Sequence, residues 1–272
     1  RVVRLCSLLG LKRPANIQAL SERLMTTMES TDSPPSPPFP WRVLLVSIIA
    51  SLNNMAFGYD VGVVSGSLLD MAGSLDLSLS EQELATSGLN FVSGIGALAG
   101  AGFVMDSLGR RATLMVSSLL LVIGGAFVTL ANSFGVLLLG RALQGLGSGC
   151  AWCACSVYIA ELAPKEYRGG LVAVSDIGIN VGILIGYAVD RSINTALPGA
   201  PDLRWRLAMG LSVVLPLLYV AACPWLPESP RWLHMAGREE EAAAVMRRLE
   251  PPAPKAGASR AAAGGAAGGA SS

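Results

Sequence analysis

Long apolar runs, separated by short polar segments, dominate the pattern of this chain. A bilayer core is crossed by about 20 apolar residues in helical form, and six runs come close to that length. They are residues 43–69, 84–105, 112–131, 134–160, 171–189 and 207–226. Because the segments between them are short, the pattern predicts an all-α membrane protein whose core is an antiparallel bundle of six transmembrane helices.

The same pattern divides the chain into segments. We expect residues 1–40 to form a cytosolic N-terminal tail that ends in the Pro-rich stretch SPPSPPFP, and residues 41–228 to form the six-helix transmembrane bundle. Residues 229–250 hold most of the motif PESPRWL and then GREEEAAAVMRRLE, which predicts a short cytosolic loop helix. The last segment, 251–272, is rich in Ala, Gly and Pro and is expected to be disordered.

The positive charges predict how the bundle is oriented. Lys and Arg gather in the N-terminal tail and after the second, fourth and sixth apolar runs, whereas Asp and Glu crowd the segment after the first run. An excess of positive charge marks the cytosolic side of a membrane protein. We therefore expect a multi-pass integral membrane protein with both termini in the cytosol, and a plasma membrane or a vacuolar membrane would both suit it.

Composition bears on the other classes of protein. Only 14% of the residues are charged and 52% are apolar, against about 25% charged residues in soluble domains. The cysteines of GCAWCACSVYIA lie in an apolar stretch, far from His234, the single histidine. A metal site or catalytic site needs a ligand cluster or a nucleophile with a base, so we expect no metal, no cofactor and no enzyme activity. The net charge of +1 gives no reason to expect a nucleic acid partner.

Glycines recur at a spacing of four in two of the runs. SGIGALAGAG contains Gly96 and Gly100, and QGLGSG contains Gly145 and Gly149. Small residues at this spacing let helix backbones approach closely in a membrane. The spacing suits helices that move against each other and equally suits static packing.

Two opposite charges interrupt the apolar runs at a similar depth. Counted along a helix, Asp60 lies about 14 Å below the outer end of the first run and Arg141 lies about 10 Å inside the fourth. An intramembrane charge is costly unless it is paired, protonated or in contact with water. We therefore expect Asp60 and Arg141 to form an ion pair, which would serve either a transported proton or the static structure of the bundle.

A third carboxylate, Asp176, lies near the middle of the fifth run, about 20 Å from its outer end. Asn180 follows on the same helix face, and Asn90 and Gln144 add polar groups in the second and fourth runs. These four residues are the candidates for binding a solute along a polar face. Alternatively, Asp176 accepts hydrogen bonds from backbone or hydroxyl groups, and the asparagines only link helices.

Five motifs in order resemble the N-terminal half of sugar porters in the major facilitator superfamily, most of all plant-type polyol/monosaccharide–proton symporters. They are FGYDVGVVSG, G-x-x-x-D-x-x-GRR at Gly102–Arg111, GRALQGLGSG, VYIAELAPKEYRG and PESPRWL. The resemblance implies a six-helix bundle that is one half of the major facilitator fold. It also implies a secondary active transporter that moves a sugar or polyol across a membrane by alternating access, coupled to protons. The acidic residue at Asp176, where many hexose carriers have Gln, favours the polyol type.

The resemblance implies roles for the charged residues as well. In proton-coupled members an Asp at the position of Asp60 carries the proton, and an Arg at the position of Arg141 tunes it. Seven further residues match a charge network on the cytosolic face. They are Asp106, Arg110, Arg111, Glu161, Arg168, Glu228 and Arg231. Such a network would hold that face closed in one state and break in the other, and loop capping is the alternative role.

The length departs from the family pattern, because these transporters have two six-helix halves with the solute between them. We expect the chain either to be a fragment of a longer carrier or to pair with a second chain that supplies the C-terminal half. Its other partners would be a sugar or polyol, protons and the lipid bilayer. An uncoupled facilitative sugar carrier and a non-transporting solute sensor or half-transporter are the alternative functions.

Overall fold

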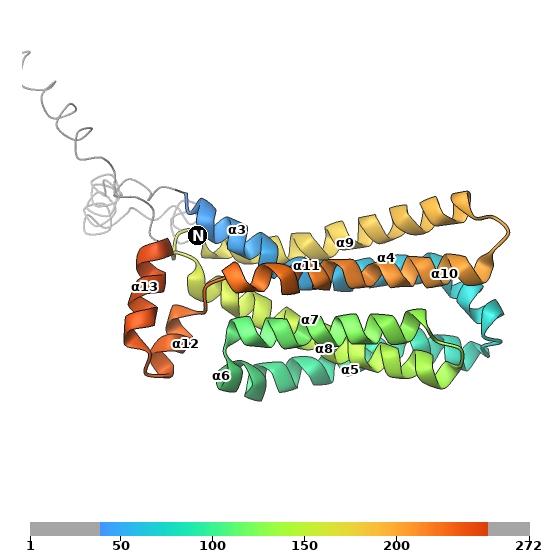
Figure 1. Cartoon of the computed structure of the whole chain (residues 1–272), viewed down its shortest axis with the longest axis horizontal. Coiled ribbons are helices and arrows are strands. Elements are labelled where there is room, and N and C mark those ends of the chain that lie inside the picture. Colours follow the sequence, from blue (N-terminus) through green and yellow to red (C-terminus); the bar gives the residue numbers. More distant parts are fainter. Residues whose placement is uncertain (1–38, 250–272) are drawn as a thin grey trace, which may run out of the picture. The chain divides into compact units, whose positions relative to one another are not determined.

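Every regular element in residues 39–249, the part of the chain that the computed structural model describes, is a helix (Figure 1). The long helices are α4 (Leu52–Ser74), α5 (Leu79–Ala99), α7 (Arg110–Thr129), α8 (Phe134–Leu162) and α9 (Arg168–Ala196). The shorter ones are α3 (Trp41–Ala50), α6 (Met105–Leu108), α10 (Pro201–Gly210), α11 (Val214–Ala222), α12 (Pro230–Met235) and α13 (Glu239–Leu249). The expectations for residues 1–38 and 250–272 lie outside the described part.

Four helical stretches are long and apolar enough to cross a membrane: Leu79–Leu108, Arg110–Thr129, Arg168–Ala196 and Pro201–Trp225. Helices α3 and α4 pass the same test together and are bent by 42°, so they make a fifth span if they are one. Helix α8 covers the remaining expected run. Its 29 residues would extend about 44 Å, but it is not among these four stretches; Arg141 and Gln144 interrupt its apolar sequence.

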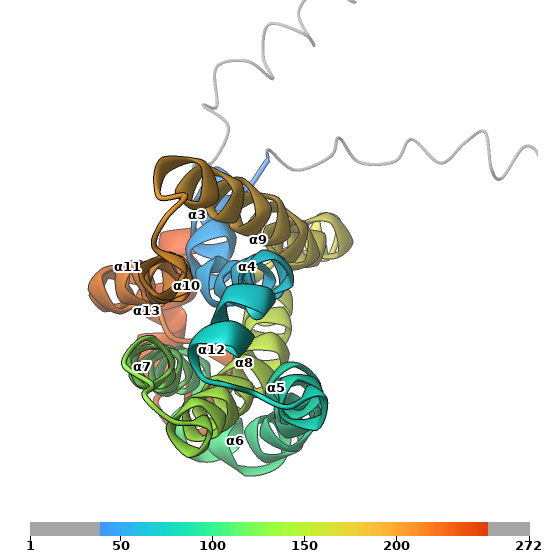
Figure 2. The same cartoon turned by 90° about the vertical axis from the view of Figure 1, so that its right-hand side faces the viewer.

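Helix α8 lies inside the bundle. It packs against both α5 and α7, while α4 packs against α9 (Figures 1 and 2). About half of the residues of α8 are buried, whereas α9, of equal length, buries only four. Helix α8 thus meets protein on most sides, and a helix so placed does not need a lipid-facing surface.

Glycines set the closest helix contacts, as their spacing predicted. Gly96 of α5 and Gly100 of the turn that follows it face Leu146 and Cys150 of α8, so a Cβ on either glycine would come within 3 Å of the partner helix. Gly149 of α8 in turn lies so close to α5 that an added Cβ would overlap the Ser93 carbonyl oxygen. The backbones of α5 and α8 therefore approach as closely as the small residues allow.

Three membrane helices are irregular, and two of the irregularities have a local cause. Between α3 and α4, the hydroxyls of Ser47 and Ser51 donate to carbonyls one turn back, at 2.8 and 2.7 Å, and such bonds bend helices. Between α10 and α11, the 3₁₀ turn Leu211–Val213 precedes Pro216. Pro216 has no N–H to donate to the carbonyl of Ser212, and its ring would clash with that carbonyl in a regular α-helix. The π-helical turn Gly100–Val104 interrupts the helix between α5 and α6.

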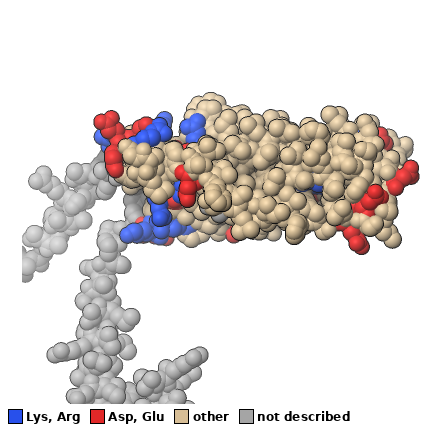
Figure 3. All heavy atoms as spheres, turned by 90° about the horizontal axis from the view of Figure 1, so that it is seen from below, with Lys and Arg blue, Asp and Glu red and all other residues tan. Residues whose placement is uncertain are grey.

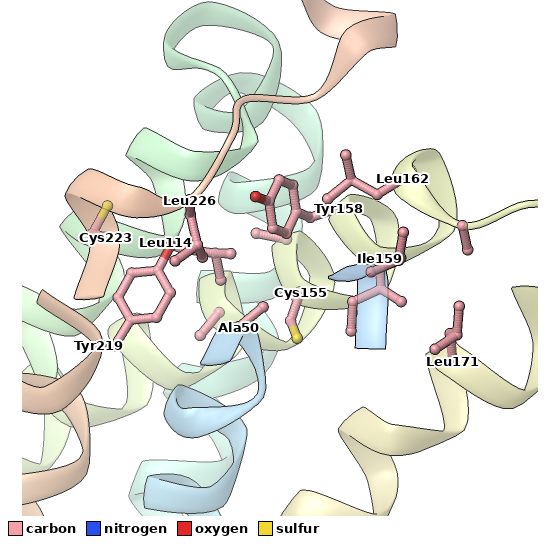
Figure 4. Close-up of a cluster of buried hydrophobic side chains, with 14 of the residues drawn as sticks. Ala50, Leu114, Cys155, Tyr158, Ile159, Leu162, Leu171, Tyr219, Cys223 and Leu226 are labelled. Carbon is pink, nitrogen blue, oxygen red and sulfur yellow. The ribbon is translucent and has the colours of Figure 1, made fainter. Parts of the chain in front are cut away.

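A tightly packed apolar cluster lies near α13 (Figure 4). Tyr158 of α8 and Tyr219 of α11 are fully buried in it, and Cys155 and Cys223 fill the space between larger side chains. Val245 of α13 packs against the same cluster. These cysteines are free thiols and act as small apolar side chains.

Charged side chains gather at the two ends of the bundle on the face seen in Figure 3, and the stretch between the ends is almost free of them. Lys and Arg concentrate at the end that carries α12 and α13, whereas acidic side chains mark the opposite end. A broad apolar belt between two charged ends is the surface that a bilayer requires.

Candidate functional site

The two intramembrane charges do meet, and they do so in the interior of the bundle. Nη1 of Arg141 on α8 donates a hydrogen bond to Oδ2 of Asp60 on α4, and the nitrogen and oxygen are 2.5 Å apart. Only 1% of Arg141 and 6% of Asp60 is exposed. Helix α8 places Arg141 on its buried face beside Gly140, and α4 places Asp60 beside Tyr59, whose hydroxyl donates to the Ala208 carbonyl at 2.7 Å.

The pair is incompletely hydrogen-bonded within residues 39–249. Nη2 of Arg141 reaches the sulfur of Met209 at 3.8 Å, and a thioether is only a weak acceptor. Nε of Arg141 and Oδ1 of Asp60 are buried without a hydrogen-bond partner in this part of the chain. A buried ion pair is stable when hydrogen bonds satisfy its remaining atoms, and this pair lacks some of them.

Two cavities reach Asp60. The first is a narrow crevice whose lining includes Gln144 and Ser148 of α8, Leu121 of α7, and Ser212 and Pro216 at the break in the sixth span. The second has a volume of about 220 Å³ and contacts both members of the ion pair. Its polar lining comes from Ser65 of α4 and from Thr86 and Asn90 of α5.

The candidate solute-binding residues do not form one cluster. Asn90 is exposed and lines the larger cavity beside Asp60, whereas Gln144 is buried in the crevice. Asp176 and Asn180 lie on the exposed face of α9, where the Asn180 amide donates to the Asp176 backbone carbonyl at 2.9 Å. Within the described residues, the polar face of the bundle is thus divided between α5 and α9.

Two asparagines of α4 have the purely structural role that was the alternative for such residues. Asn53 donates to the Leu114 carbonyl at 3.2 Å and accepts from Ser118 at 2.8 Å, which joins α4 to α7. Asn54 donates to the Ser175 hydroxyl at 2.6 Å, which joins α4 to α9.

Most of the expected charge network is present at the α12–α13 end. Arg110 is buried and binds Glu161 through Nη2 at 3.1 Å and Asp106 through Nη1 at 3.3 Å. Ser229 donates to the other oxygen of Glu161 at 2.5 Å. These contacts connect α6, α7 and α8 with the segment that follows the sixth span.

Glu228 completes this network through backbone groups. Its Oε1 accepts from the backbone N–H groups of Arg110 and Arg111 at 3.0 and 3.1 Å, and from that of Ser229 at 2.9 Å. The first N–H groups of a helix have no partner within the helix, so Glu228 caps the start of α7. Gly109 precedes it with φ of 91°, a left-handed conformation that glycine adopts readily.

Two expected members stand apart from the network in this structure. Arg168 is the first residue of α9 and Arg231 lies in α12, and both are exposed with no ion pair among the described residues. Sequence reasoning also missed a second cluster at the far end of the bundle. There Arg204 binds Asp70 at 2.6 Å, and the buried Trp205 donates to Ser74 at 2.9 Å. The only signal for it was that charges of both signs occur in the loops on that side.

Together, these contacts describe a bundle with the buried Asp60–Arg141 pair beside two cavities and charge clusters at both ends. Within residues 39–249 no group of three or more His, Cys, Asp or Glu side chains is placed to hold a metal ion. The arrangement places a buried carboxylate beside two cavities, and it ties the segment before α12 to α6, α7 and α8.

Comparisons with known proteins bear on this site. The chain matches the family model described as "Sugar (and other) transporter" over residues 46–264. It is 39% identical over 199 residues to "Probable polyol transporter 4" of Arabidopsis thaliana, which covers 72% of this chain and 36% of the relative. It is also 36% identical over 195 residues to "Solute carrier family 2, facilitated glucose transporter member 12" of Homo sapiens, over 72% of this chain and 31% of the relative.

Solved structures show the same likeness. A partially occluded inward-open conformation of the xylose transporter XylE from E. coli superposes with a TM-score of 0.71 and 26% identity, over 76% of this chain and 55% of that chain. The proton:xylose symporter XylE bound to 6-bromo-6-deoxy-D-glucose gives a TM-score of 0.72 at 25% identity, over 82% and 52%. The chain thus spans about a third of these curated relatives and about half of the solved carriers.

Proposed function

We propose that this chain, which belongs to the Sugar (and other) transporter family of the major facilitator superfamily and corresponds to its N-terminal half, serves a carrier that moves a sugar or polyol across a membrane by alternating access, coupled to protons. Its relatives are transporters and not enzymes. The buried Asp60–Arg141 pair beside two cavities is the single observation that supports the proposal most strongly.

The electrostatics of an Asp–Arg pair support proton coupling. A carboxylate beside a guanidinium is stable in its charged form, and the same carboxylate in an apolar setting is stable when protonated. A movement of α4 against α8 that separated Asp60 from Arg141 would therefore favour protonation of Asp60. Return of Arg141 would release the proton, so one cycle of helix movement would carry one proton.

The solute would lie along the exposed polar positions of this half. Asn90 lines the cavity that contains Asp60, and Asp176 and Asn180 face away from the bundle on α9. An ionised carboxylate accepts hydrogen bonds from two hydroxyls, and amides both donate and accept. Gln144 would contribute from the crevice side of the ion pair.

The charge cluster at the α12–α13 end would act as the latch of the carrier. Arg110 with Asp106 and Glu161, and Glu228 with the start of α7, tie four segments together in this structure. Breaking these contacts would free that end for the opposite state, a switch in which ion pairs change partners. In that state the carboxylates of this cluster would need other partners. Three further arginines close to them in sequence could supply these: Arg111, Arg168 and Arg231.

The proposal requires a second six-helix half and a defined orientation. Carriers of this superfamily bind solute between two halves, so the C-terminal half would come from the same polypeptide or from a partner chain. The positive α12–α13 end would face the cytosol. An antibody against residues 227–249, used on native membranes, separates the sources: a band at 28.1 kDa requires a partner chain, and a band of about twice that mass does not.

Replacing Asp60 by Asn tests the proposal. In cells that lack their own hexose and polyol carriers, the variant should lose accumulation against a gradient at acidic external pH, because Asn cannot bind the proton. Exchange of labelled for unlabelled solute should continue, because it needs no net proton movement. Accumulation equal to that of the unmodified chain would refute the role of Asp60.

An uncoupled sugar carrier is the second candidate, because one relative is by name a facilitated glucose transporter. In such a carrier the Asp60–Arg141 pair would be structural. Uptake would then stop at equal concentrations on both sides and would not depend on a pH gradient. If the chain supports neither uptake nor exchange but still binds solute, the sensor or half-transporter function remains.

A further inference from the structure

Two buried acceptor atoms face the same crevice. Oδ1 of Asp60 and Oε1 of Gln144 are both buried without a hydrogen-bond partner in the described part of the chain, and both residues line the crevice. Gln144 is 4% exposed, so its amide group has no contact with bulk water. Leaving a buried acceptor unpaired costs about 1–3 kcal/mol, and such atoms in folded proteins nearly always have a partner.

The break in the sixth span reaches the same crevice. Ser212 and Pro216 line the crevice, and Pro216 has no N–H for the carbonyl of Ser212, its regular partner one turn back. Helix breaks of this kind in membranes are tolerated where side chains or ordered waters satisfy the freed groups. The crevice is therefore rich in acceptors, and it calls for a molecule that donates.

The free space limits which donor can enter. It amounts to about 10 Å³, roughly the least that admits one water molecule and far too little for a sugar or polyol carbon chain. A water donates two hydrogen bonds and needs two to four polar partners. Asp60 and Gln144 supply two acceptors, and the hydroxyls of Ser148 and Ser212 lie in the same lining.

We propose that one ordered water molecule binds in this crevice between Asp60 Oδ1 and Gln144 Oε1, and that Gln144 is a positioning residue for the proton at Asp60. The water joins the carboxylate oxygen that Arg141 leaves unbound to the amide of Gln144. It completes the hydrogen bonding of the ion pair in the charged state. The existence of the water site stands by itself, whereas its role in proton exchange rests on the proposed transport function.

Few other groups near Asp60 could position its proton in place of Gln144. Arg141 from α8 and Tyr59 from its own helix are the charged and titratable neighbours among the described residues, and the Tyr59 hydroxyl is engaged by Ala208. Asp190 of α9 is bound by Ser67 and Asn194. Helices α5, α7 and α11 present only neutral side chains to the two cavities.

X-ray radiolytic labelling in ¹⁸O-water tests the water site on the purified full chain in lipid nanodiscs. Short pulses turn bound water into hydroxyl radicals that oxidise the adjacent side chains. Leu121 lines the crevice and Leu114 lies outside it on the same helix, and the two are 6% and 0% exposed. We expect Leu121 to take up the label several-fold faster than Leu114. Equal, background labelling of both would overturn the proposal.

Variants of Gln144 link the label to the proposed partner. Gln144→Met keeps the length of the side chain without its amide. Gln144→Leu gives a shorter side chain with a branched apolar end. At least one of the two variants is expected to fold. Either should bring Leu121 down to the level of Leu114. Gln82→Leu, which makes a matched change where the glutamine donates to the Leu77 carbonyl, should leave the label unchanged. Persistent labelling in both folded Gln144 variants would overturn the assignment of Gln144.

Added solute distinguishes water from a solute hydroxyl as the occupant. Labelling of Leu121 that is unchanged by saturating sorbitol or myo-inositol supports water, and loss of labelling would mean that a solute hydroxyl occupies the crevice instead. The role in proton exchange has its own readout: Gln144→Met should shift the pH dependence of accumulation. An unchanged pH profile would contradict it. If Asp60→Asn does not affect accumulation, the transport proposal fails and the water site is still judged by the label.

Discussion

At the scale of single residues, the buried pair of Asp60 on α4 and Arg141 on α8 suits a carboxylate that changes its protonation state better than a permanent structural ion pair. Arg141 gives one strong hydrogen bond to Asp60, a weak one to Met209, and leaves Nε without a described partner. A buried charge pair with unmet hydrogen bonds gains little over an apolar pair of the same volume. The proposed role of Asp60 in binding a proton would give such a pair a function other than stability.

Removing one member of the pair should cost more than removing both. Arg141→Leu leaves the Asp60 carboxylate buried and uncompensated, and we expect a loss of about 3–5 kcal/mol of stability. Asp60→Asn combined with Arg141→Leu should recover most of that loss. Thermal unfolding of the detergent-solubilised chain measures the effect, and a double variant as unstable as the single one would contradict the explanation.

The sequence predicted the partners at this scale only where charge or depth constrained them. Asp60 and Arg141 could be matched because an intramembrane charge must find its opposite at a similar depth. Gln144 and Asp176 could not be placed, because the face of the helix on which a polar residue lies depends on which neighbours cover it. The structure buries Gln144 between α4, α7 and α11, and it leaves Asp176 on the uncovered face of α9.

At the scale of elements, close packing of α4 on α9 leaves no room for side chains at the contact. Gly58 of α4 lies against the backbone of Ile179, and an added Cβ would overlap its carbonyl oxygen. Gly182 of α9 faces the Met55 carbonyl in the same way. The two helices therefore pack backbone against backbone at this contact, which a larger side chain at either glycine would push apart.

Gly58→Ala should destabilise the bundle, because the two helices would have to move apart, and overpacking typically costs about 1–3 kcal/mol. Gly94→Ala is the matched control: Gly94 lies on α5 with nothing within 4 Å of the added Cβ. There the alanine should stabilise the helix by about 0.5–1 kcal/mol. Thermal unfolding of both variants compares them, and equal effects would disprove the packing argument.

Glu228 should hold α12 and α13 against the bundle. Glu228→Ala removes the acceptor of three backbone N–H groups at the start of α7 and before α12, and loss of a helix cap costs about 1 kcal/mol. We expect trypsin to cut after the exposed Arg231 and Arg238 several-fold faster than in the unmodified chain. Glu240→Ala, at an exposed position of α13, is the control, and equal cutting rates in the two variants would exclude this role of Glu228.

The positions of the helices follow from hydropathy, whereas their interruptions do not. Each predicted apolar run overlaps a helical stretch, because helices satisfy the backbone groups of an apolar segment in a bilayer, but the ends differ by several residues, as for 171–189 against Arg168–Ala196. The bend at Ser51 depends on which carbonyl a serine hydroxyl chooses. The π-helical turn at Gly100–Val104 has no cause that the sequence shows.

At the scale of the whole molecule, the uneven charge of the two ends predicts orientation. The α12–α13 end should face the cytosol. Leu79→Cys and Met235→Cys place exposed thiols at opposite ends, because Leu79 is 78% and Met235 60% exposed. A membrane-impermeant maleimide should label the former in intact cells and the latter only after permeabilisation. The unmodified chain measures the background, and the reverse pattern would invert the orientation.

The surface of the bundle also has a place for a second half. Helix α9 buries few of its residues, and its uncovered side carries Asp176 and Asn180 together with exposed apolar residues such as Ile177 and Leu184. Lipid would cover an apolar face, but a carboxylate at this depth needs water or protein.

The fold class and the family could be predicted from the sequence because five motifs occur in order. The residues that contact solute could not be predicted, because in this superfamily they meet across two halves.

If this chain serves a carrier that couples solute movement to protons through Asp60, addition of solute should cause proton uptake. Cells that express the chain are suspended in weak buffer, a pulse of hexose or polyol is added, and the external pH is followed. We predict alkalinisation that matches solute entry and that disappears in Asp60→Asn. Solute entry without any change in external pH, in a chain with Asp60 intact, would exclude proton coupling through Asp60.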